Sequence, residues 1–290
     1  MTHSHHPDIE KYKYYIVDAF SNKPFGGNTA GVVLLDSTGF PNAGLMQHVA
    51  AELRYSETAF VLREPDGAWH LRYFTPNGEV ELCGHATVAT FVLLHHNGLA
   101  SGASLCRTLA GELQVEAAPR VMMQMATPRI VATLGPDDVA EAYRAVGHSN
   151  PCPTLPVQVA YSGLPDVMLP IPSVEALNAL QPDMAAVAAL TQRINAVSIH
   201  PFALSDDGHT AHVRDFAPAY GVPEESATGT ANAALTHYLA ANGIVQPGCH
   251  SFLQGEAMGR PSVVDTLLDA YGTIWVGGTA AIVAEGWLYM

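Results

Sequence analysis

An internal repeat is the feature of this sequence that most constrains its fold. The segment that begins at Gly84 reads GHATVATFVLLHHNGL, and the segment that begins at Gly229, about 145 residues later, reads GTANAALTHYLAANGI. Each copy follows an Arg-x-Phe-x-Pro element, at 72–76 and at 214–218. Both segments combine an initial glycine, an apolar body and a final Asn-Gly pair, which is typical of a buried helix with a defined C-terminus. Two related halves therefore predict a paired site in the cleft between two equivalent helices.

The repeat also includes a strand, a helix and a second strand in the same order in each half. The expected elements are strands at 30–35, 57–62, 166–171 and 196–202 and helices at 41–53 and 182–194. The offset is 141 residues at the prolines that open the helices, 142 at the Arg-x-Phe-x-Pro elements and 145 at the glycine-initiated helices, as duplication followed by small insertions would leave. Many short strands around few helices indicate an α+β fold of two pseudo-symmetric halves, residues 1–120 and 121–290.

Composition narrows the classes of partner. The net charge of −14 and the lack of a Lys/Arg cluster argue against nucleic acid and anionic membranes. No apolar run reaches the roughly 18–20 residues needed to span a bilayer. The four cysteines form no CxxC pair, which indicates a reducing, cytoplasmic location. The start, MTHSHHPDIEK, lacks the apolar core of a signal peptide, and we interpret its histidines as a solvated tail.

The starts of the two repeated helices are candidate anion sites. Helix N-termini expose unpaired amide N–H groups and the positive end of the helix dipole. The sequences 83–85 and 228–230 could therefore cradle a carboxylate or a developing oxyanion. The alternative is that Gly84 and Gly229 only permit tight turns from loop to helix.

Glu57 is the candidate proton carrier. It begins an expected strand in the setting RYSETAFVL, and burial in a mostly apolar strand should raise its pKa. A raised pKa suits a general acid or base near neutral pH. The equivalent residue of the other half is Ser198, so the scaffold does not require an acid here. The alternative is a glutamate on an edge strand that faces water.

Five motifs occur in a fixed order along the chain. They are PFGGNTAGVVL (24–34), SETAF (56–60), the FTP…LCGHAT segment (74–87), GVPEESATGTA (221–231) and QGEAMGRPS (254–262). Together they resemble the PhzF-like phenazine-biosynthesis isomerase family, from about residue 13 to the C-terminus. The resemblance implies the diaminopimelate-epimerase-like fold, in which each half is a β-barrel around a central helix. It also implies a homodimer.

The resemblance implies roles for individual positions. The acid/base glutamate of the family falls on Glu57, and its Gly-His pair falls on Gly84 and His85. A neutral imidazole at His85 could hold a substrate carboxylate or shuttle a proton, although the residue could also act only as a helix cap. Asn28 lies where the family has a Gly-Asn pair and is a possible substrate contact.

The family's E-D-P-A-T-G-S motif falls on residues 224–230, where this sequence departs from it twice. Glu225 replaces the aspartate and Thr230 replaces the serine, so both functional groups are preserved. One extra methylene shifts a carboxylate by about 1 Å, and misplacement of that size can cost roughly 100-fold in rate. We therefore expect a substrate different from the dihydro-hydroxyanthranilate of the founding member.

The expected function is that of a cofactor-independent isomerase that moves a proton between carbons of a small carboxylate metabolite. Its catalytic residues would be Glu57, His85 and Glu225, and its substrate-binding residues Asn28, Gly84, Gly229 and Thr230. No metal or other cofactor is expected, because the histidines lack metal-ligand spacing and the glycine-rich segments lack nucleotide-binding spacing.

Two alternatives remain open from the sequence. One is a non-catalytic ligand-binding or interaction protein on the same scaffold. The other is a racemase or epimerase of the same fold, which would use two cysteines, one at each helix start. Cys83 occupies the first of those positions, but its counterpart Thr228 cannot act as a thiol base. A helix N-terminus lowers a thiol pKa and could make Cys83 reactive, but we interpret Cys83 as a small buried packing residue.

Overall fold

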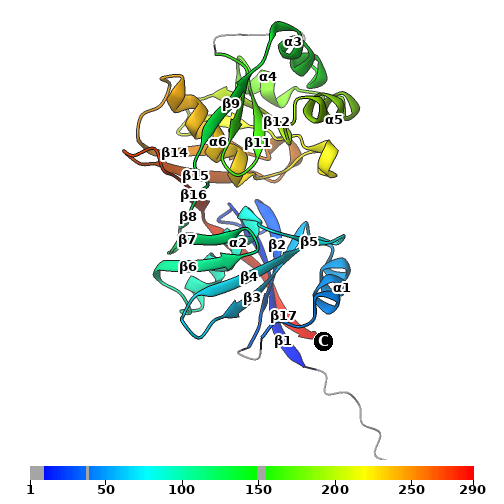
Figure 1. Cartoon of the computed structure of the whole chain (residues 1–290), viewed down its shortest axis with the longest axis vertical. Helices are drawn as coiled ribbons and strands as arrows, with labels where there is room; N and C mark the ends of the chain where they lie inside the picture. Colours follow the sequence, from blue (N-terminus) through cyan, green and yellow to red (C-terminus); the bar gives the residue numbers. More distant parts are fainter. Residues whose placement is uncertain (1–9, 37–38, 149–154) are drawn as a thin grey trace, which may run out of the picture.

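Two lobes, stacked along the long axis of the molecule, each consist of a curved sheet around one long helix (Figure 1). The computed structural model describes residues 10–36, 39–148 and 155–290, so the histidine-containing tail and Cys152 lie outside the described residues. Helix α2 (Gly84–His96) occupies the first lobe and helix α6 (Gly229–Ala241) the second. The predicted α+β architecture of two similar halves is confirmed.

Eight strands form the sheet of the first lobe. In pairing order they are β17 (Ala280–Tyr289), β1 (Lys11–Ala19), β2 (Asn28–Leu34), β3 (Glu57–Arg63), β4 (Trp69–Phe74), β6 (Gly102–Thr108), β7 (Gly111–Ala117) and β8 (Val121–Gln124). The short β5 (Glu79–Val80) pairs with β4. Helix α1 (Ala43–Leu53), which the sequence predicted at 41–53, connects β2 to the parallel β3, and the Asn42 side chain caps it by accepting from the Leu45 amide.

The second lobe repeats this order of pairing. Its strands are β9 (Arg129–Thr133), β10 (Gln158–Tyr161), β11 (Pro165–Pro170), β12 (Ser198–Leu204), β13 (Ala211–Val213), β14 (Gly248–Gln254), β15 (Ser262–Leu268) and β16 (Ile274–Gly278). Helices α3 (Pro136–Ala145), α4 (Val174–Asn178) and α5 (Met184–Arg193) lie outside the sheet. Glu57 pairs with Ala30 and Ser198 with Asp166 in the matching parallel ladders, which confirms that Glu57 and Ser198 are equivalent.

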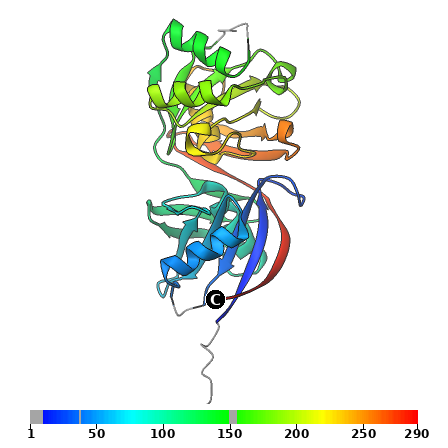
Figure 2. The ribbon, with the colours of Figure 1, turned by 90° about the vertical axis from the view of Figure 1, so that its right-hand side faces the viewer.

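The chain crosses twice between the lobes. Strand β8 pairs with β16 of the other lobe, and after β16 the chain returns so that β17 pairs with β1 (Figure 2). At this crossing a Cβ on Gly277 would lie 1.8 Å from the Val121 carbonyl oxygen, so only glycine fits. A division of the chain at residue 120 stays a prediction, and the pairing of β17 carries residues 280–289 to the first lobe.

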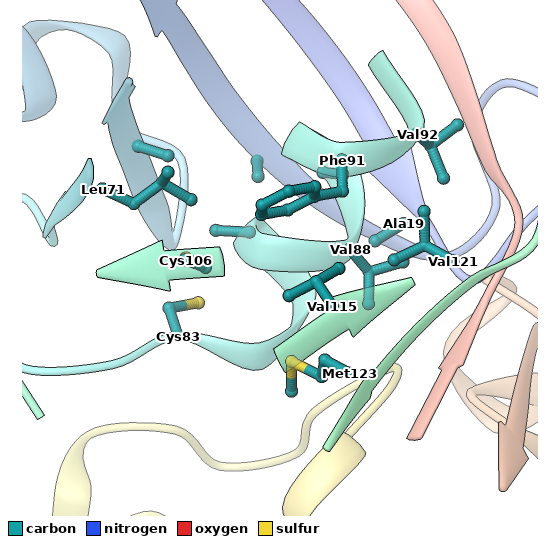
Figure 3. Close-up of a cluster of buried hydrophobic side chains, with 14 of the residues drawn as sticks. Ala19, Leu71, Cys83, Val88, Phe91, Val92, Cys106, Val115, Val121 and Met123 are labelled. Carbon is teal, nitrogen blue, oxygen red and sulfur yellow. The ribbon is translucent and has the colours of Figure 1, made fainter. Parts of the chain in front are cut away.

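Helix α2 is buried on nearly all sides, as its all-round apolar sequence predicted. Phe91, Val88 and Val92 project from it into a core formed with the surrounding strands (Figure 3). Among its polar side chains, Thr87 is satisfied within the fold, since its Oγ1 donates to the Cys83 carbonyl at 2.7 Å. The helices that the structure describes include none that is both long and apolar enough to span a membrane.

Candidate active site

The starts of helices α2 and α6 lie between the lobes, and the two helices contact each other there. Their N-cap residues, Cys83 and Thr228, have extended backbones, and neither provides a side-chain cap. The first amide N–H groups of both helices therefore have no capping side chain. A Cβ on Gly84 would press on Met123 Cε at 3.2 Å, whereas one on Gly229 would meet Val276 at an ordinary 3.5 Å. Packing against Met123 is therefore one reason for glycine at position 84. The suitability of both helix starts for an anion depends on their uncapped amide groups, not on the glycines.

A carboxyl–imidazole pair lies at the start of α2. Glu57, the first residue of β3, places Oε2 at 3.2 Å from His85 Nε2. Ser56 Oγ lies 3.2 Å from the same nitrogen. The His85 side chain is 5% exposed and the Glu57 side chain 20%, so the pair is mostly shielded from solvent.

The pKa values of this pair reverse an expectation from the sequence. Burial raises the pKa of Glu57, but the hydrogen bonds and charge of His85 outweigh it and hold that pKa below its usual value. Burial by itself lowers the pKa of His85. The Cys83 sulfur and the Glu57 carboxylate have a larger effect in the opposite direction, so the pKa of His85 lies well above its usual value. The raised pKa predicted for Glu57 and the neutral imidazole predicted for His85 are therefore wrong, because neither prediction could include the partner. The two directions favour a carboxylate at Glu57 beside a protonated ring at His85.

Asn28 connects this pair to the second lobe. Its Nδ2 donates to Glu225 Oε1 at 3.0 Å and to the Ala227 carbonyl at 3.2 Å, and it lies 3.2 Å from His85 Nδ1. Glu225 Oε1 itself lies 3.9 Å from His85 Nδ1. Burial raises the pKa of Glu225 to about 7; His85 lowers it and the Asp215 charge raises it. The Glu57 carboxyl, whose pKa is lowered, and the Glu225 carboxyl, whose pKa is raised, thus both lie near the His85 imidazole.

The structure places the seven predicted site residues unequally. Glu57, His85, Asn28 and Glu225 form one network of direct contacts, and Gly84 adjoins it in the chain. Gly229 and Thr230 begin the opposing helix and adjoin the network through Thr228, whose hydroxyl lies 2.6 Å from Glu225 Oε2. The Thr230 methyl faces the loop between β10 and β11, since a Cβ on Gly163 would approach it to 3.3 Å.

Sequence reasoning missed the groups behind Glu225. Asp215 lies within the repeated Arg-x-Phe-x-Pro element, where the first half has Tyr73, and this mismatch was the available signal. His200, which showed no carboxylate spacing in the sequence, places Nδ1 at 2.9 Å from Asp215 Oδ1. The arginines of the two elements are structural, since Arg72 pairs with Glu79 at 2.6 Å and Arg214 with Glu224 at 2.8 Å.

Cys83 completes the surroundings of His85. Its sulfur lies 3.4 Å from His85 Nδ1, and burial raises the thiol pKa above its usual value. The Cys83 thiol therefore does not have the lowered pKa that would make it reactive. Ligand atoms of Glu57, Cys83 and His85 all lie within 4.8 Å of one another and could hold a metal ion. A metal would have to displace protons from both the thiol and the imidazolium, which opposes binding near neutral pH.

The two similar lobes have the diaminopimelate-epimerase-like fold, and carboxyl groups from both lobes lie near one imidazole between them. Residues 17–286 match the profile of the family described as phenazine biosynthesis-like protein, PhzC-PhzF, and the chain belongs to this family. An uncharacterized isomerase of Escherichia coli is 33% identical over 94% of this chain and 96% of its own. The trans-2,3-dihydro-3-hydroxyanthranilate isomerase of Pseudomonas fluorescens is 34% identical over 87% and 89%.

The solved structures agree with the sequence relatives. The crystal structure of a PhzF-family phenazine biosynthesis protein from Bacillus anthracis superposes with a TM-score of 0.85. It is 27% identical and covers 97% of this chain and 100% of that one. The protein is thus a small-molecule isomerase of the PhzF family.

Proposed function

We propose that this isomerase moves a proton between two carbons of a small, unsaturated or cyclic carboxylate, with side chains alone as acid and base. The observation that carries the proposal is that the Glu57 carboxyl lies 3.2 Å from one nitrogen of His85 and the Glu225 carboxyl 3.9 Å from the other. The pKa of Glu57 lies below its usual value and that of Glu225 is raised to about 7. Carboxyl groups separated in this way can act as base and acid at the same pH.

In the proposed reaction, the Glu57 carboxylate removes a proton from a substrate carbon. The electron pair of the broken C–H bond delocalises into the unsaturated system and onto the substrate carboxylate. The His85 imidazolium and the uncapped amides at the starts of α2 and α6 would stabilise this negative charge. Proton delivery at a second carbon, by Glu225 with the assistance of His85, then completes an isomerisation with no net change in the composition of the substrate.

The substrate is proposed to be related to that of the Pseudomonas fluorescens relative but distinct from it. The relative's name supplies the first probe, trans-2,3-dihydro-3-hydroxyanthranilate. The longer Glu225 side chain narrows the cleft beside Asn28 and His85, since Glu225 Oε1 already lies 3.0 Å from Asn28 Nδ2. A smaller or differently substituted carboxylate would fit this arrangement better.

Deuterium wash-in tests the proposal. The wild-type protein in D2O should introduce deuterium at a carbon of the probe or of a related unsaturated carboxylate, followed by NMR. Glu57→Gln should slow this exchange by about 10²- to 10⁴-fold, the usual contribution of general acid/base catalysis, while leaving ligand binding nearly intact. Glu64→Gln is the matched control, because Glu64 also contacts a histidine, His70 at 2.8 Å, away from the cleft. A protein that binds these carboxylates without exchange is a binding protein, and normal exchange by Glu57→Gln rejects the role of Glu57.

We also propose a cytoplasmic homodimer. The reduced state of the three described cysteines supports the first part, and the resemblance to the family supports the second. Sedimentation equilibrium of the purified chain should give the mass of two copies, and a monomer at micromolar concentration would contradict the dimer.

A further inference from the structure

A chain of buried polar groups leads from Glu225 into the second lobe. Thr228 Oγ1 lies 2.6 Å from Glu225 Oε2 and 3.3 Å from Asp215 Oδ2. Ser198 Oγ then lies 2.7 Å from Asp215 Oδ1 and 2.9 Å from Asp166 Oδ1. Three carboxyl groups are thereby connected through two hydroxyl groups.

The inner part of this chain is closed to solvent. The residues Asp166, Ser198, His200 and Asp215 are each at most 2% exposed. The guanidinium of the adjacent Arg214 points away and pairs with Glu224 at 2.8 Å. Like charges in such a site cannot all be ionised, so protons must be shared among the carboxyl groups.

The hydrogen-bond count determines where those protons lie. Each hydroxyl has one hydrogen but lies between two carboxyl groups, so one carboxyl of each pair has to donate. His200 Nδ1 lies 2.9 Å from Asp215 Oδ1, and the Asp215 carboxyl also faces both hydroxyl groups. Asp215 is the carboxyl that the two hydroxyl groups share, so in this assignment it accepts from both of them. The donating carboxyls are then Asp166 on one side and Glu225 on the other.

We infer that Asp215 is a positioning residue that acts through the Thr228 hydroxyl to keep Glu225 protonated in the free enzyme. The inference rests on the proposed function in that it assigns Glu225 the acid role opposite Glu57. Protonated Glu225 donates to Thr228, and Thr228 donates to Asp215. Gln254 Nε2 fills the remaining acceptor position of the Thr228 hydroxyl at 3.1 Å, so the hydroxyl is fully bonded in this state.

The groups that face Glu225 from the other elements agree with this state. From the first lobe, His85 lowers the pKa of Glu225 and Glu57 raises it, while Asn28 is neutral. From the second lobe, the Asp215 charge raises it, and burial provides the largest contribution, for a pKa of about 7. Asp166 has a pKa well above its usual value, because it is buried and lies near the Asp215 charge, as the hydrogen-bond count requires.

This arrangement gives the network a defined response to proton transfer. When Glu225 releases its proton to a substrate atom, the Thr228 hydroxyl can rotate its hydrogen from Asp215 to the new carboxylate. The O–H bond of Glu225 breaks, a bond to the substrate atom forms, and the other network protons stay in place. Substrate deprotonation by Glu57 and protonation by Glu225 would then leave the total proton count of enzyme and substrate unchanged.

Carbon-13 NMR of the protein labelled at the glutamate δ-carbon tests the inference without any substrate. The Glu225 signal is assigned by its loss in Glu225→Gln. In the wild-type protein it should titrate near neutral pH, and in Asp215→Asn its pKa should fall by about one to two pH units, because the nearby negative charge is gone. The asparagine keeps the shape of the side chain and can donate to Thr228, which then donates to an ionised Glu225.

Asp265→Asn is the matched control, because Asp265 is also mostly buried in the second lobe but pairs with Arg120 at 2.8 Å, outside this network. It should leave the Glu225 titration unchanged. Titration of wild-type Glu225 below pH 5, or an equal pKa in wild type and Asp215→Asn, would overturn the inference. The wild-type titration decides the protonation state even if Asp215→Asn does not fold. Deuterium exchange by Glu57→Gln tests the proposed reaction separately, so the two can fail independently.

Discussion

Arg260 connects the second lobe to the first through hydrogen bonds and an ion pair. Its replacement tests how much these contacts contribute to the free energy of unfolding. From the loop between β14 and β15, its Nη2 donates to the Gly26 carbonyl at 2.7 Å and to Asp18 Oδ1 at 3.0 Å. Its Nε donates to the Gly27 carbonyl at 2.9 Å. The bound loop leads directly into Asn28, so Arg260 positions one wall of the active site from the opposite lobe.

The expected cost of Arg260→Met follows from these contacts. Removing one partner of a buried ion pair typically costs about 3–5 kcal/mol, because it leaves an uncompensated charge. The Asp18 side chain is 2% exposed but keeps the Phe25 amide and Thr29 hydroxyl as donors, and Arg260 is 34% exposed. These factors reduce the expected loss to about 2–3 kcal/mol.

Urea unfolding followed by tryptophan fluorescence measures this loss. Arg193→Met is the matched control, because Arg193 also pairs with two acids, Asp138 at 2.7 Å and Glu141 at 2.6 Å, but is 49% exposed. An exposed pair should cost less than about 1 kcal/mol. Deuterium exchange should also fall in Arg260→Met, because a shift of about 1 Å in Asn28 can cost roughly 100-fold. Equal losses of stability in the two variants would refute the argument from burial.

Two further predictions concern pH and backbone packing. The folded-state pKa of Glu225 is raised from 4.5 to about 7, so its proton stabilises the fold at low pH, and up to about 3 kcal/mol is lost as pH rises through about 7. Glu225→Gln should remove this pH-dependent loss of stability. If urea unfolding shows that the free energy of unfolding changes equally in wild type and variant between pH 5 and pH 8, this prediction is wrong. Gly277→Ala should destabilise by about 3 kcal/mol or more, because its Cβ would overlap the Val121 carbonyl. Gly78→Ala, where a Cβ has open space, should change the unfolding midpoint little.

Much of the secondary structure could be predicted from the sequence, because helix starts and ends are determined by residues that are close together in the chain. The cap at Asn42 and the similar cap at Asp183 start helices α1 and α5 where predicted. The Asn-Gly pairs end α2 and α6, with Gly98 and Gly243 at positive φ. Because the two halves keep these local signals in one order, their equivalence was also predictable.

The composition of the site was only partly predictable. Glu57, His85, Asn28 and Glu225 were all named from motifs, and the structure brings them into contact. The neighbours of Glu225 in the second lobe were not, because Asp166, Ser198 and Asp215 come from separate elements. No spacing in the sequence marks a hydrogen-bond chain that forms only when strands β11 and β12 meet the loops that follow β13 and precede α6.

The repeat alone thus determined two helical halves, the glycine starts of their helices and the single acid that breaks their symmetry. Tertiary structure decided the return of β17 to the first lobe and the charge of each site residue. Burial alone would raise the pKa of Glu57, yet the ring of His85 at 3.2 Å lowers it. The sign of such a shift depends on distances between residues far apart in the chain, because charge interactions act through space and not along the sequence.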